Sequence, residues 1–353
     1  MKKKLLITLC SLALIIVIAV CVLCFQKEPA KICYTTRSFG FFDTVATIKG
    51  YAENEEEFGK IVNDIFALLD EYHQLFDIYN SYDGINNLRT ANSLYDGEHK
   101  VITVDRKIID MLLYAKKMYN LTGGEMNIAM GSVLSIWHDY REAGREDPST
   151  AKLPPMERLR AAAEHTDINT MIIDKANSTV TLTDPEMSLD VGAIAKGYAV
   201  EMVAQHMEQK GITGYVINVG GNVRTLGAKP DGSGWTVGVE NPDEDAADYL
   251  AYLQLNGKSL ITSGSYQRYF IVDGKRYHHI IDPATLMPAE YFTSVSIVCD
   301  SSADGDALST ALFCMTYEQG LALIESLDGV EAMWLTVDGK QYYSSGFSSY
   351  QAE

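Results

Sequence analysis

The sequence predicts an α+β fold with largely antiparallel sheets and packed helices, in a single domain that follows an N-terminal apolar segment. Short segments rich in β-branched residues recur through the second half of the chain, and few helical patterns separate them. Parallel strands need a long crossover between them, usually a helix, so many strands with few helices indicate antiparallel pairing. No polar linker divides the chain. We therefore expect one domain over residues 36–350.

The N-terminal segment differs from the rest of the chain. Residues 5–25 carry no charge and no proline, and three lysines precede them. As a helix this run would be roughly 31 Å long, enough to cross a bilayer, and the lysines would keep its start cytoplasmic. The pattern favours an uncleaved anchor over residues 1–26 and a tether over residues 27–35, with the domain on the extracytoplasmic face of the cell membrane. A lipoprotein attached through Cys21 or Cys24 and a cleaved signal peptide remain open.

The charge balance narrows the class of partner. The chain has 29 Lys and Arg against 47 Asp and Glu, which gives a formal net charge of −18. Binding to phosphate polymers needs a basic surface, so this balance argues against a nucleic-acid partner.

The cysteines suggest neither a disulfide framework nor a zinc site. Only Cys33, Cys299 and Cys314 lie beyond the apolar segment, and this odd set contains no CxxC pair. Cys299 and Cys314 have apolar neighbours, so we expect both in the core.

The first part of the domain begins with a strand and two helices. Residues 42–48 read as a strand, and residues 54–75 carry apolar side chains at helical spacing. A second helix is expected over residues 105–120, ending at the Gly123-Gly124 pair, which is a common helix terminator. Mixed segments follow to about residue 163.

The rest of the chain alternates short strands with two helices. Strands are predicted at residues 171–173, 180–182, 215–219, 235–239, 250–255, 270–272, 294–298 and 332–336. Helices are predicted near residues 195–210 and 305–327. Four glycine-rich or acidic segments lie among these elements, and they contain the residues that suggest chemistry.

The first such segment runs from Asp190 to Tyr198. An aspartate ends a strand, Gly192 makes the turn and a helix begins. A helix N-terminus offers free N–H groups and a positive potential, so a phosphate could bind there with the charge of Lys196. An ordinary turn with Asp190 as the helix cap is the alternative.

The second segment is the Gly220-Gly221 pair, which follows the strand at 215–219. Two glycines permit positive φ angles or a close approach of the backbone to a ligand. A tight hairpin accounts for them equally well.

The third segment contains paired histidines on the return strand of a hairpin that turns at Asp273-Gly274. Alternation along a strand points His278 and His279 to opposite faces, so we expect one to face solvent and the other a site. No third nitrogen or thiolate ligand lies at metal spacing, which argues against a metal role.

The fourth segment places Asp306 and Thr310 four residues apart, on one face of a helix. A carboxylate and a hydroxyl can supply oxygen ligands to Mg²⁺, which keeps the rest of its shell for water and substrate phosphate. The alternative is that Asp306 only favours the helix N-terminus and that Thr310 bonds back to the preceding turn.

Taken in order, these segments resemble the FAD:protein FMN transferase family (ApbE-like) over about residues 42–327. The matching motifs are Phe41-Phe42-Asp43-Thr44, Tyr79-Asn80 with Asn86-Asn87, Gly124-Glu125-Met126-Asn127-Ile128 with Trp137 downstream, Asp190 to Tyr198, Thr262-Ser263-Gly264, His279-Ile280-Ile281-Asp282-Pro283 and Asp306-Ala307-Leu308-Ser309-Thr310. The chain departs from the family pattern with Phe42 where Met is usual, Asp43 where Gly is usual and Asn127 where Asp is usual.

The resemblance implies an enzyme that binds FAD and Mg²⁺, transfers FMN to a Thr or Ser hydroxyl of a target protein and releases AMP. It implies metal ligation by Asp306, Thr310 and a backbone carbonyl near Ala193. The implied flavin-binding residues are Phe42, Tyr79, Glu125, Met126, Asn127, Asp190, Lys196 and Ile280. A hydroxyl nucleophile benefits from a nearby base. The candidate for this base is His279, and an acidic residue near the metal is the alternative. Asp306 is assigned to the catalytic centre because it would bind the metal.

Several finer points remain open in this interpretation. An acidic protein would offset pyrophosphate charge through a metal ion instead of an arginine cluster. Asn127 could still bond an adenine or ribose group, and Phe42 and Tyr79 could simply pack in the core. A Mg²⁺-dependent FAD pyrophosphatase and a non-catalytic flavin-binding protein at the membrane surface are the competing functions. The acceptors implied by the family and the topology are exported or membrane-attached redox proteins.

Overall fold

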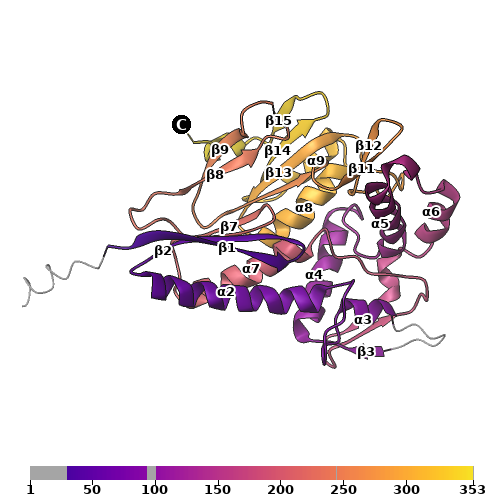
Figure 1. Ribbon diagram of the computed structural model, residues 1–353, viewed down its shortest axis with the longest axis horizontal. Coiled ribbons are helices and arrows are strands. Elements are labelled where there is room, and N and C mark those ends of the chain that lie inside the picture. The colour runs from indigo at the N-terminus through magenta and orange to yellow at the C-terminus, as the bar shows by residue number, and fades with distance from the viewer. Residues whose placement is uncertain (1–29, 94–100, 244, 353) are drawn as a thin grey trace, which may run out of the picture.

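The centre of the molecule is an antiparallel sheet. The computed structural model describes residues 30–93, 101–243 and 245–352 (Figure 1). Within them the central sheet has the strand order β1 (Ile32–Phe41), β2 (Thr44–Ala52), β6 (Tyr215–Val219), β7 (Asn222–Leu226), β10 (Ser259–Gly264), β13 (Phe292–Cys299), β14 (Glu331–Thr336) and β15 (Gln341–Tyr343). Every neighbouring pair in it is antiparallel. The predicted α+β class with antiparallel sheets is therefore confirmed.

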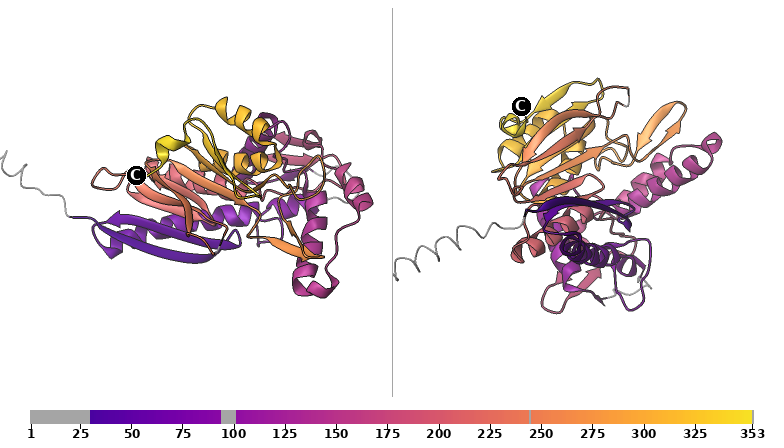
Figure 2. Two further views of the ribbon diagram at one scale, coloured as in Figure 1. Left: turned by 90° about the horizontal axis from the view of Figure 1, so that it is seen from above. Right: turned by 60° about the vertical axis from the view of Figure 1, so that its left-hand side comes forward.

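Three smaller sheets and a set of helices complete the fold. The smaller sheets are β3 (Val101–Thr103) with β5 (Thr179–Leu182) and β4 (Met171–Asp174), β8 (Trp235–Glu240) with β9 (Tyr249–Leu255), and β11 (Tyr269–Val272) with β12 (Lys275–His278). The helices are α2 (Glu55–Phe76), α3 (Leu88–Ser93), α4 (Arg106–Leu121), α5 (Gly131–Glu146), α6 (Met156–Ala163), α7 (Ala195–Gln209), α8 (Ser302–Cys314) and α9 (Tyr317–Glu325). Figure 2 shows α5, α6 and the β11–β12 hairpin together at the end of the molecule away from the start of β1.

The two faces of the central sheet bury different clusters. Ile297 of β13 joins the main core with α2, α4, α7 and α8, whereas its neighbour Val298 joins a smaller core with β8 and β9. Alternation along a strand explains the division, because successive side chains point to opposite faces. The central sheet is therefore covered by helices on one face and by the β8–β9 ribbon on the other.

Helix α2 shows why the helical predictions were successful. Asn54 caps the helix by accepting a hydrogen bond from Glu57 N, and three glutamates occupy its first turn. Both features suit the positive end of a helix. Phe58, Ile65 and Leu69 form the buried face at helical spacing. The helices predicted at 54–75, 105–120 and 195–210 correspond to α2, α4 and α7 within a residue or two.

Two predicted elements were wrong in their bounds. The strand predicted at 42–48 begins only at Thr44, because Phe42 and Asp43 form the turn of the β1–β2 hairpin. The helix predicted at 305–327 is two helices, α8 and α9. Thr316 interrupts it with extended backbone and forms a reciprocal capping box with Gln319, which stabilises a new helix start.

Other parts of the structure were not predicted. Strands β1, β3, β7, β10 and β15 had no predicted counterpart, and α5 and α6 occupy a region left as mixed segments. Strand β1 begins at Ile32, inside the predicted tether over 27–35. The predicted anchor over residues 1–26 lies outside the described residues. None of the helices that the structure describes has the length and apolar content needed to span a bilayer.

The described residues include three cysteines, two of which were predicted to lie in the core. Cys299 and Cys314 are buried, as predicted, and Cys33 is exposed. None of the three forms a disulfide. Burial raises the pKa of both buried thiols, so they are poor nucleophiles.

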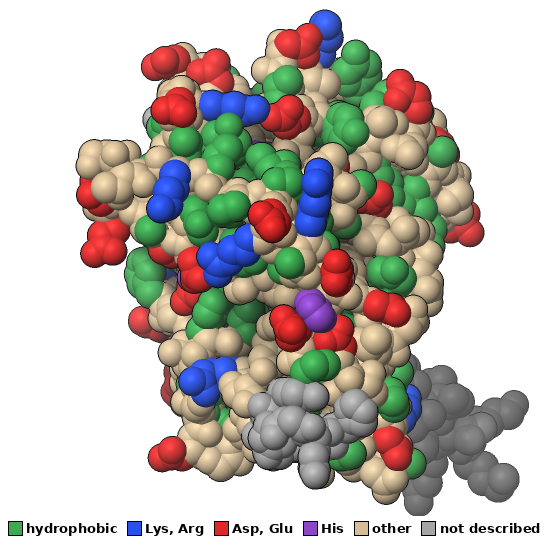
Figure 3. All heavy atoms as spheres, turned by 90° about the vertical axis from the view of Figure 1, so that its right-hand side faces the viewer, with side chains coloured by type: hydrophobic (Ala, Val, Ile, Leu, Met, Phe, Trp, Pro, Cys, Tyr) green, Lys and Arg blue, Asp and Glu red, His purple; other side chains and the backbone are tan. Residues whose placement is uncertain are grey.

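On the surface, Figure 3 shows acidic and basic side chains interspersed with apolar ones over one face.

Candidate active site

A pocket of about 280 Å³ collects the residues that the sequence singled out. Its walls come from the β1–β2 turn, the segment after α2, the loop before α5 and α5 itself, the turn before α7, the β6–β7 hairpin, strand β10, the segments on either side of the β11–β12 hairpin, and helix α8. The predicted site residues that line it are Phe42, Tyr79, Glu125, Met126, Asn127, Asp190, Ala193, Lys196, His279, Ile280, Asp306 and Thr310. All the residues proposed for one site therefore meet in one pocket, while their individual roles stay predictions.

Asp306 lies where helices α7 and α8 cross. Its side chain is almost fully buried, and its Oδ2 accepts a hydrogen bond of 2.7 Å from the Gly197 N–H. Burial raises the pKa of Asp306 above its ordinary value, while the Lys196 ammonium and the Gly197 N–H oppose that shift. The positive end of α7 therefore stabilises a carboxylate that would otherwise be costly to bury.

Close packing of the two helices makes this bond possible. A Cβ at Gly197 would lie 2.3 Å from Asp306 Cβ and 2.4 Å from the Ser302 carbonyl oxygen. Glu201, one turn along α7, accepts a bond of 2.9 Å from Ser302 N at the start of α8 and pairs with Arg224 of β7. The position of Asp306 thus depends on a glycine and on a buried ion pair.

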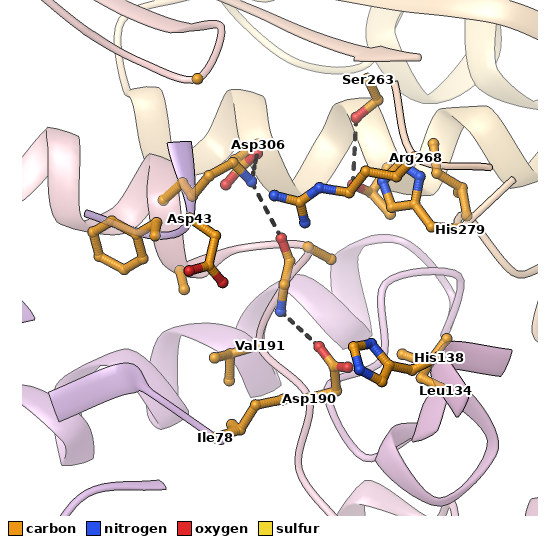
Figure 4. Close-up of a pocket in the computed structure, with 18 of the residues that line it drawn as sticks. Asp43, Ile78, Leu134, His138, Asp190, Val191, Ser263, Arg268, His279 and Asp306 are labelled. Carbon is orange, nitrogen blue, oxygen red and sulfur yellow. Dashed lines mark hydrogen bonds and ion pairs between the residues drawn. The ribbon is translucent and has the colours of Figure 1, made fainter. Parts of the chain in front are cut away.

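A chain of contacts links Asp306 to Asp190 across the pocket (Figure 4). Lys196 Nζ lies 3.8 Å from Asp306 Oδ1 and donates to Gly192 O at 3.4 Å. Gly192 N in turn donates to Asp190 Oδ1 at 2.8 Å. Burial raises the pKa of Asp190, against the opposing effects of the Gly192 N–H and of nearby positive charges. Lys196 therefore lies between two carboxylates instead of projecting freely into the pocket.

The turn before α7 corrects one alternative. The residue preceding the helix is Ile194, which makes no side-chain cap, so Asp190 is not the cap of α7. Gly197 N–H, in the first turn of the helix, is already taken by Asp306. Ala195 N donates to Val191 O and Tyr198 N to Ile194 O. A phosphate at this end of the helix would therefore be bound mainly by the Lys196 side chain and not by a row of free N–H groups.

Thr310 lies on the same helix face as Asp306, and both line the pocket. Ser263 Oγ on β10 lies 2.8 Å from Ser309 Oγ and 3.5 Å from Thr310 Oγ1. The bond back to the preceding turn comes from Ser309, whose Oγ donates to Asp306 O at 3.1 Å, and not from Thr310 as the alternative had it. The Thr310 hydroxyl oxygen thus keeps lone pairs for a ligand.

Hard oxygen donors surround this end of the pocket. Asp306 carboxylate, Thr310 hydroxyl and the backbone near Ala193 all line it. No cluster of three or more His, Cys, Asp or Glu side chains suited to a metal occurs among the described residues. This donor set fits Mg²⁺, which commonly uses one or two protein oxygens and completes its shell with water and phosphate.

The two histidines differ from the expectation that one faces solvent. His278 is buried against Phe313, donates from Nε2 to Ala289 O at 2.8 Å and accepts from Ile280 N at 3.2 Å. His279 lines the pocket, and its buried Nδ1 has no hydrogen-bond partner among the described residues. Alternation still points the two rings apart, but protein covers both faces because α8 packs against the segment that follows β12.

The environment of His279 keeps the ring neutral. Burial and the positive charge of Arg268, with smaller effects from His278, Arg141 and Lys196, lower the pKa of His279 to about 3. A neutral imidazole has a nitrogen lone pair available at neutral pH, but a pKa this low makes it a weak base.

The lowered pKa of His279 predicts a pH profile. Because the folded pKa of about 3 lies far below the ordinary 6.5, the ring stays neutral as the pH falls from 8 to about 5. We expect kcat/KM for FAD to show no acid limb from His279 in that range. Measuring kcat/KM against pH for the wild type and for His138→Asn, which removes another pocket histidine, tests this. An acid limb near pH 6.5 in both proteins would contradict it.

Two arginines that the sequence analysis did not single out also line the pocket. Arg141 of α5 contacts His138 at 3.0 Å, and Arg268 lies between β10 and β11. The sequence led us to expect that a metal ion, instead of an arginine cluster, offsets pyrophosphate charge; the structure adds two arginines to the lining of this pocket, and the metal stays a prediction. Neither residue belongs to a recognisable spacing, so only the fold reveals them.

Three polar side chains in the pocket differ in whether their hydrogen-bonding atoms already have partners within the protein. Asn127 donates from Nδ2 to Thr166 O at 3.0 Å and accepts at Oδ1 from Ala129 N at 2.9 Å. Glu125 Oε2 and Asn222 Oδ1 are buried and have no partner among the described residues. Burial, with the nearby Asp282 charge, raises the pKa of Glu125. Glu125 and Asn222 are therefore better placed than Asn127 to bond a ligand.

Comparison with known proteins places the chain in a family. Residues 42–334 match the ApbE family. The FAD:protein FMN transferase of Klebsiella pneumoniae (strain 342) is 32% identical over 290 residues, which are 82% of this chain and 85% of the relative. The FAD:protein FMN transferase of Treponema pallidum (strain Nichols) is 29% identical over 344 residues, which are 93% and 92% of the two chains.

Solved structures agree with this placement. The ApbE protein from Thermotoga maritima aligns with a TM-score of 0.79 and 26% identity, covering 91% of this chain and all of the other. The flavin transferase ApbE from Vibrio cholerae aligns with a TM-score of 0.74 and 25% identity, covering 91% and 99%. The family match at residues 42–334 includes every residue that lines the pocket, and the chain therefore belongs to the ApbE family.

Proposed function

We propose that this chain is an FAD:protein FMN transferase that uses Mg²⁺ to attach FMN to a Thr or Ser hydroxyl of an acceptor protein. In this reaction the acceptor oxygen bonds to the FMN phosphorus, the pyrophosphate P–O bond breaks and AMP leaves. The observation that carries the proposal is the meeting of Asp306, Thr310 and the neutral His279 in one pocket.

The metal would be held by the Asp306 carboxylate, the Thr310 hydroxyl and a backbone carbonyl near Ala193. When bound, the cation offsets negative charge on the phosphoryl oxygens and on the departing AMP. Lys196, Arg141 and Arg268 add positive charge to the lining of the same pocket. An acidic protein can therefore accept a pyrophosphate, because cations gather locally where the negative ligand lies.

The remaining residues orient the reactants. Phe42 and Tyr79 present aromatic surface to the pocket, which suits stacking against a flavin ring. His279 takes the proton from the acceptor hydroxyl at its unpartnered nitrogen. Glu125 and Asn222 supply buried polar groups that a bound ligand would satisfy.

The acceptor assay is the test of this function. The purified protein is incubated with FAD, Mg²⁺ and a candidate acceptor domain, and we expect AMP together with flavin that stays on the acceptor after denaturation. Mass spectrometry then locates the modified hydroxyl. Free FMN and AMP without labelled acceptor would instead indicate an FAD pyrophosphatase, in which water replaces the hydroxyl. FAD binding without AMP release would indicate a non-catalytic flavin-binding protein.

The proposal extends to location. The apolar run at residues 5–25 and the lysines before it support a membrane anchor that holds the enzyme on the extracytoplasmic face. Exported or membrane-attached redox proteins would then be the acceptors. Recovery of the full-length protein in the membrane fraction, and release of the domain by protease added outside intact cells, are the expected results.

A further inference from the structure

The β1–β2 hairpin makes an unfavourable turn at the edge of the pocket. Phe41 pairs with Thr44, so Phe42 and Asp43 alone form the loop, and their φ angles are 51° and 52°. Two-residue hairpin turns of this kind favour Asn-Gly, because side chains larger than glycine disfavour positive φ. Non-glycine residues keep such a conformation only where their surroundings enforce it.

His73 of α2 provides that enforcement. Phe42 N donates a hydrogen bond of 3.3 Å to His73 Nδ1, and the two rings meet edge to face with centroids 5.5 Å apart. One side chain therefore holds both the backbone and the ring of Phe42. The backbone bond requires a lone pair on Nδ1, which places the ring proton on Nε2.

The same histidine connects the turn to the loop that carries Tyr79. His73 Nε2 lies 3.3 Å from Tyr82 Oη, and the Tyr82 hydroxyl donates to Asp77 Oδ2 at 2.8 Å. Asp77 Oδ1 accepts from Tyr79 N at 2.6 Å and from Asn80 N at 3.0 Å. The donors and acceptors run in one consistent direction, from the Phe42 N–H through His73 and Tyr82 to Asp77.

Asp77 is suited to end this chain. Its burial alone would raise the pKa of the carboxyl, but the hydrogen bonds from Asn80, Tyr79 and Tyr82 outweigh that effect and lower it. The carboxylate is therefore ionised and fully engaged, which makes its bonds to the Tyr79 loop strong. Phe42, His73, Asp77 and Tyr79 all line the pocket, so the chain of bonds follows one of its walls.

We propose that His73 is a positioning residue that locks the Phe42–Asp43 turn to the Tyr79 loop, so that both aromatic side chains are pre-organised to bind the flavin ring of FAD. The inference rests on the proposed function, because it assigns the flavin to this wall. His73 acts through Phe42 and Tyr82, and a wall held in advance spares the ligand the cost of ordering it. Tight flavin binding should therefore depend on the hydrogen-bonding atoms of His73 more than on its bulk.

Three variants separate positioning from simple packing. His73→Phe keeps a ring but removes both nitrogens, His73→Asn keeps an acceptor for the Phe42 N–H, and Asp43→Gly makes the turn favourable by itself. We expect His73→Phe to weaken FAD affinity about tenfold, as when the competent turn is populated about one tenth of the time. The Asn variant should bind within about threefold of wild type, and adding Asp43→Gly to His73→Phe should recover part of the loss.

FAD affinity is measured by equilibrium fluorescence titration, and kcat and KM for FAD by AMP release, with circular dichroism confirming the fold. We expect the loss in KM to exceed the loss in kcat. Wild-type affinity in His73→Phe, or a loss that neither Asn nor Asp43→Gly relieves, would overturn the positioning role and leave the proposed function intact. Failure of the wild type to bind FAD would overturn the proposed function instead. Should His73→Phe unfold, the Asn variant and Asp43→Gly alone still decide the question by their affinities.

Discussion

Asp306→Ala should lower AMP release from FAD by at least about 100-fold, the range seen when a preorganised electrostatic group is removed from an active site. The substitution removes the carboxylate that lies 3.8 Å from Lys196 Nζ and is the proposed metal ligand. It also leaves the Gly197 N–H without its acceptor, which costs about 1–3 kcal/mol of stability. Turnover is measured by chromatographic detection of AMP and stability by thermal unfolding.

Asp306→Asn is the matched control for that prediction. Its amide oxygen can still accept the Gly197 N–H, so the stability loss should be smaller than in the alanine variant. The charge is gone in both, so turnover should be equally low. An asparagine variant that works within about threefold of wild type would show that the negative charge at this position is not required.

Gly197→Ala should be the second most damaging change, although it adds only a methyl group. The new Cβ would lie 2.4 Å from the Ser302 carbonyl oxygen, a backbone atom that cannot turn aside. Separating α7 from α8 would cost about 1–3 kcal/mol, as overpacking of a filled core usually does. It would also withdraw Asp306 from the positive end of α7. We therefore expect the rate of FMN transfer to fall by a larger factor than the loss of unfolding free energy alone would explain.

Gly59→Ala separates this effect from a general effect of alanine at helical glycines. Gly59 lies inside α2, where an added Cβ would meet no atom within 4 Å. We expect a gain of about 0.5–1 kcal/mol there, because alanine is the better helix former, and wild-type activity. Equal losses in the two variants by chemical denaturation would contradict the clash at Gly197.

Periodicity and capping allowed much of the fold to be predicted from the sequence. Helix α2 has an apolar stripe and a capped start, so local signals agree with the final structure. Strand β1 carried no such signal, because most of its side chains remain partly or fully exposed. The α8–α9 break was missed although Thr316 and Gln319 spell a capping box, since apolar residues continue across it.

The candidate site was predictable where its residues lie close in the chain. Asp306 and Thr310 share a helix face at a spacing of four, and Asp190 and Lys196 belong to one turn. Arg141 and Arg268 reach the pocket only because α5 packs against the β11–β12 hairpin. Tertiary packing creates that arrangement, and no local pattern encodes it.

The turn at Phe42 shows a different limit. The β-branched residues after it extended the predicted strand backwards, because Phe and Asp are not typical of a two-residue hairpin loop. The stabilising partner, His73, lies on another element. A conformation that depends on a distant side chain cannot be inferred from the turn residues alone.

The pairing of β2 with β6 has a consequence for how the molecule forms. Ala46 bonds opposite Val219 and Gly50 opposite Tyr215, so the pocket wall at Phe42 joins the rest only after most of the chain has been synthesised. Contacts between such distant segments slow folding. Until they form, the β1–β2 hairpin exposes the edge of β2, which is a template for aggregation. Because the pocket wall at Phe42 is complete only after this pairing, flavin affinity reports on complete folding. A chain that ends before residue 215 lacks β6, and we expect it to be recovered insoluble.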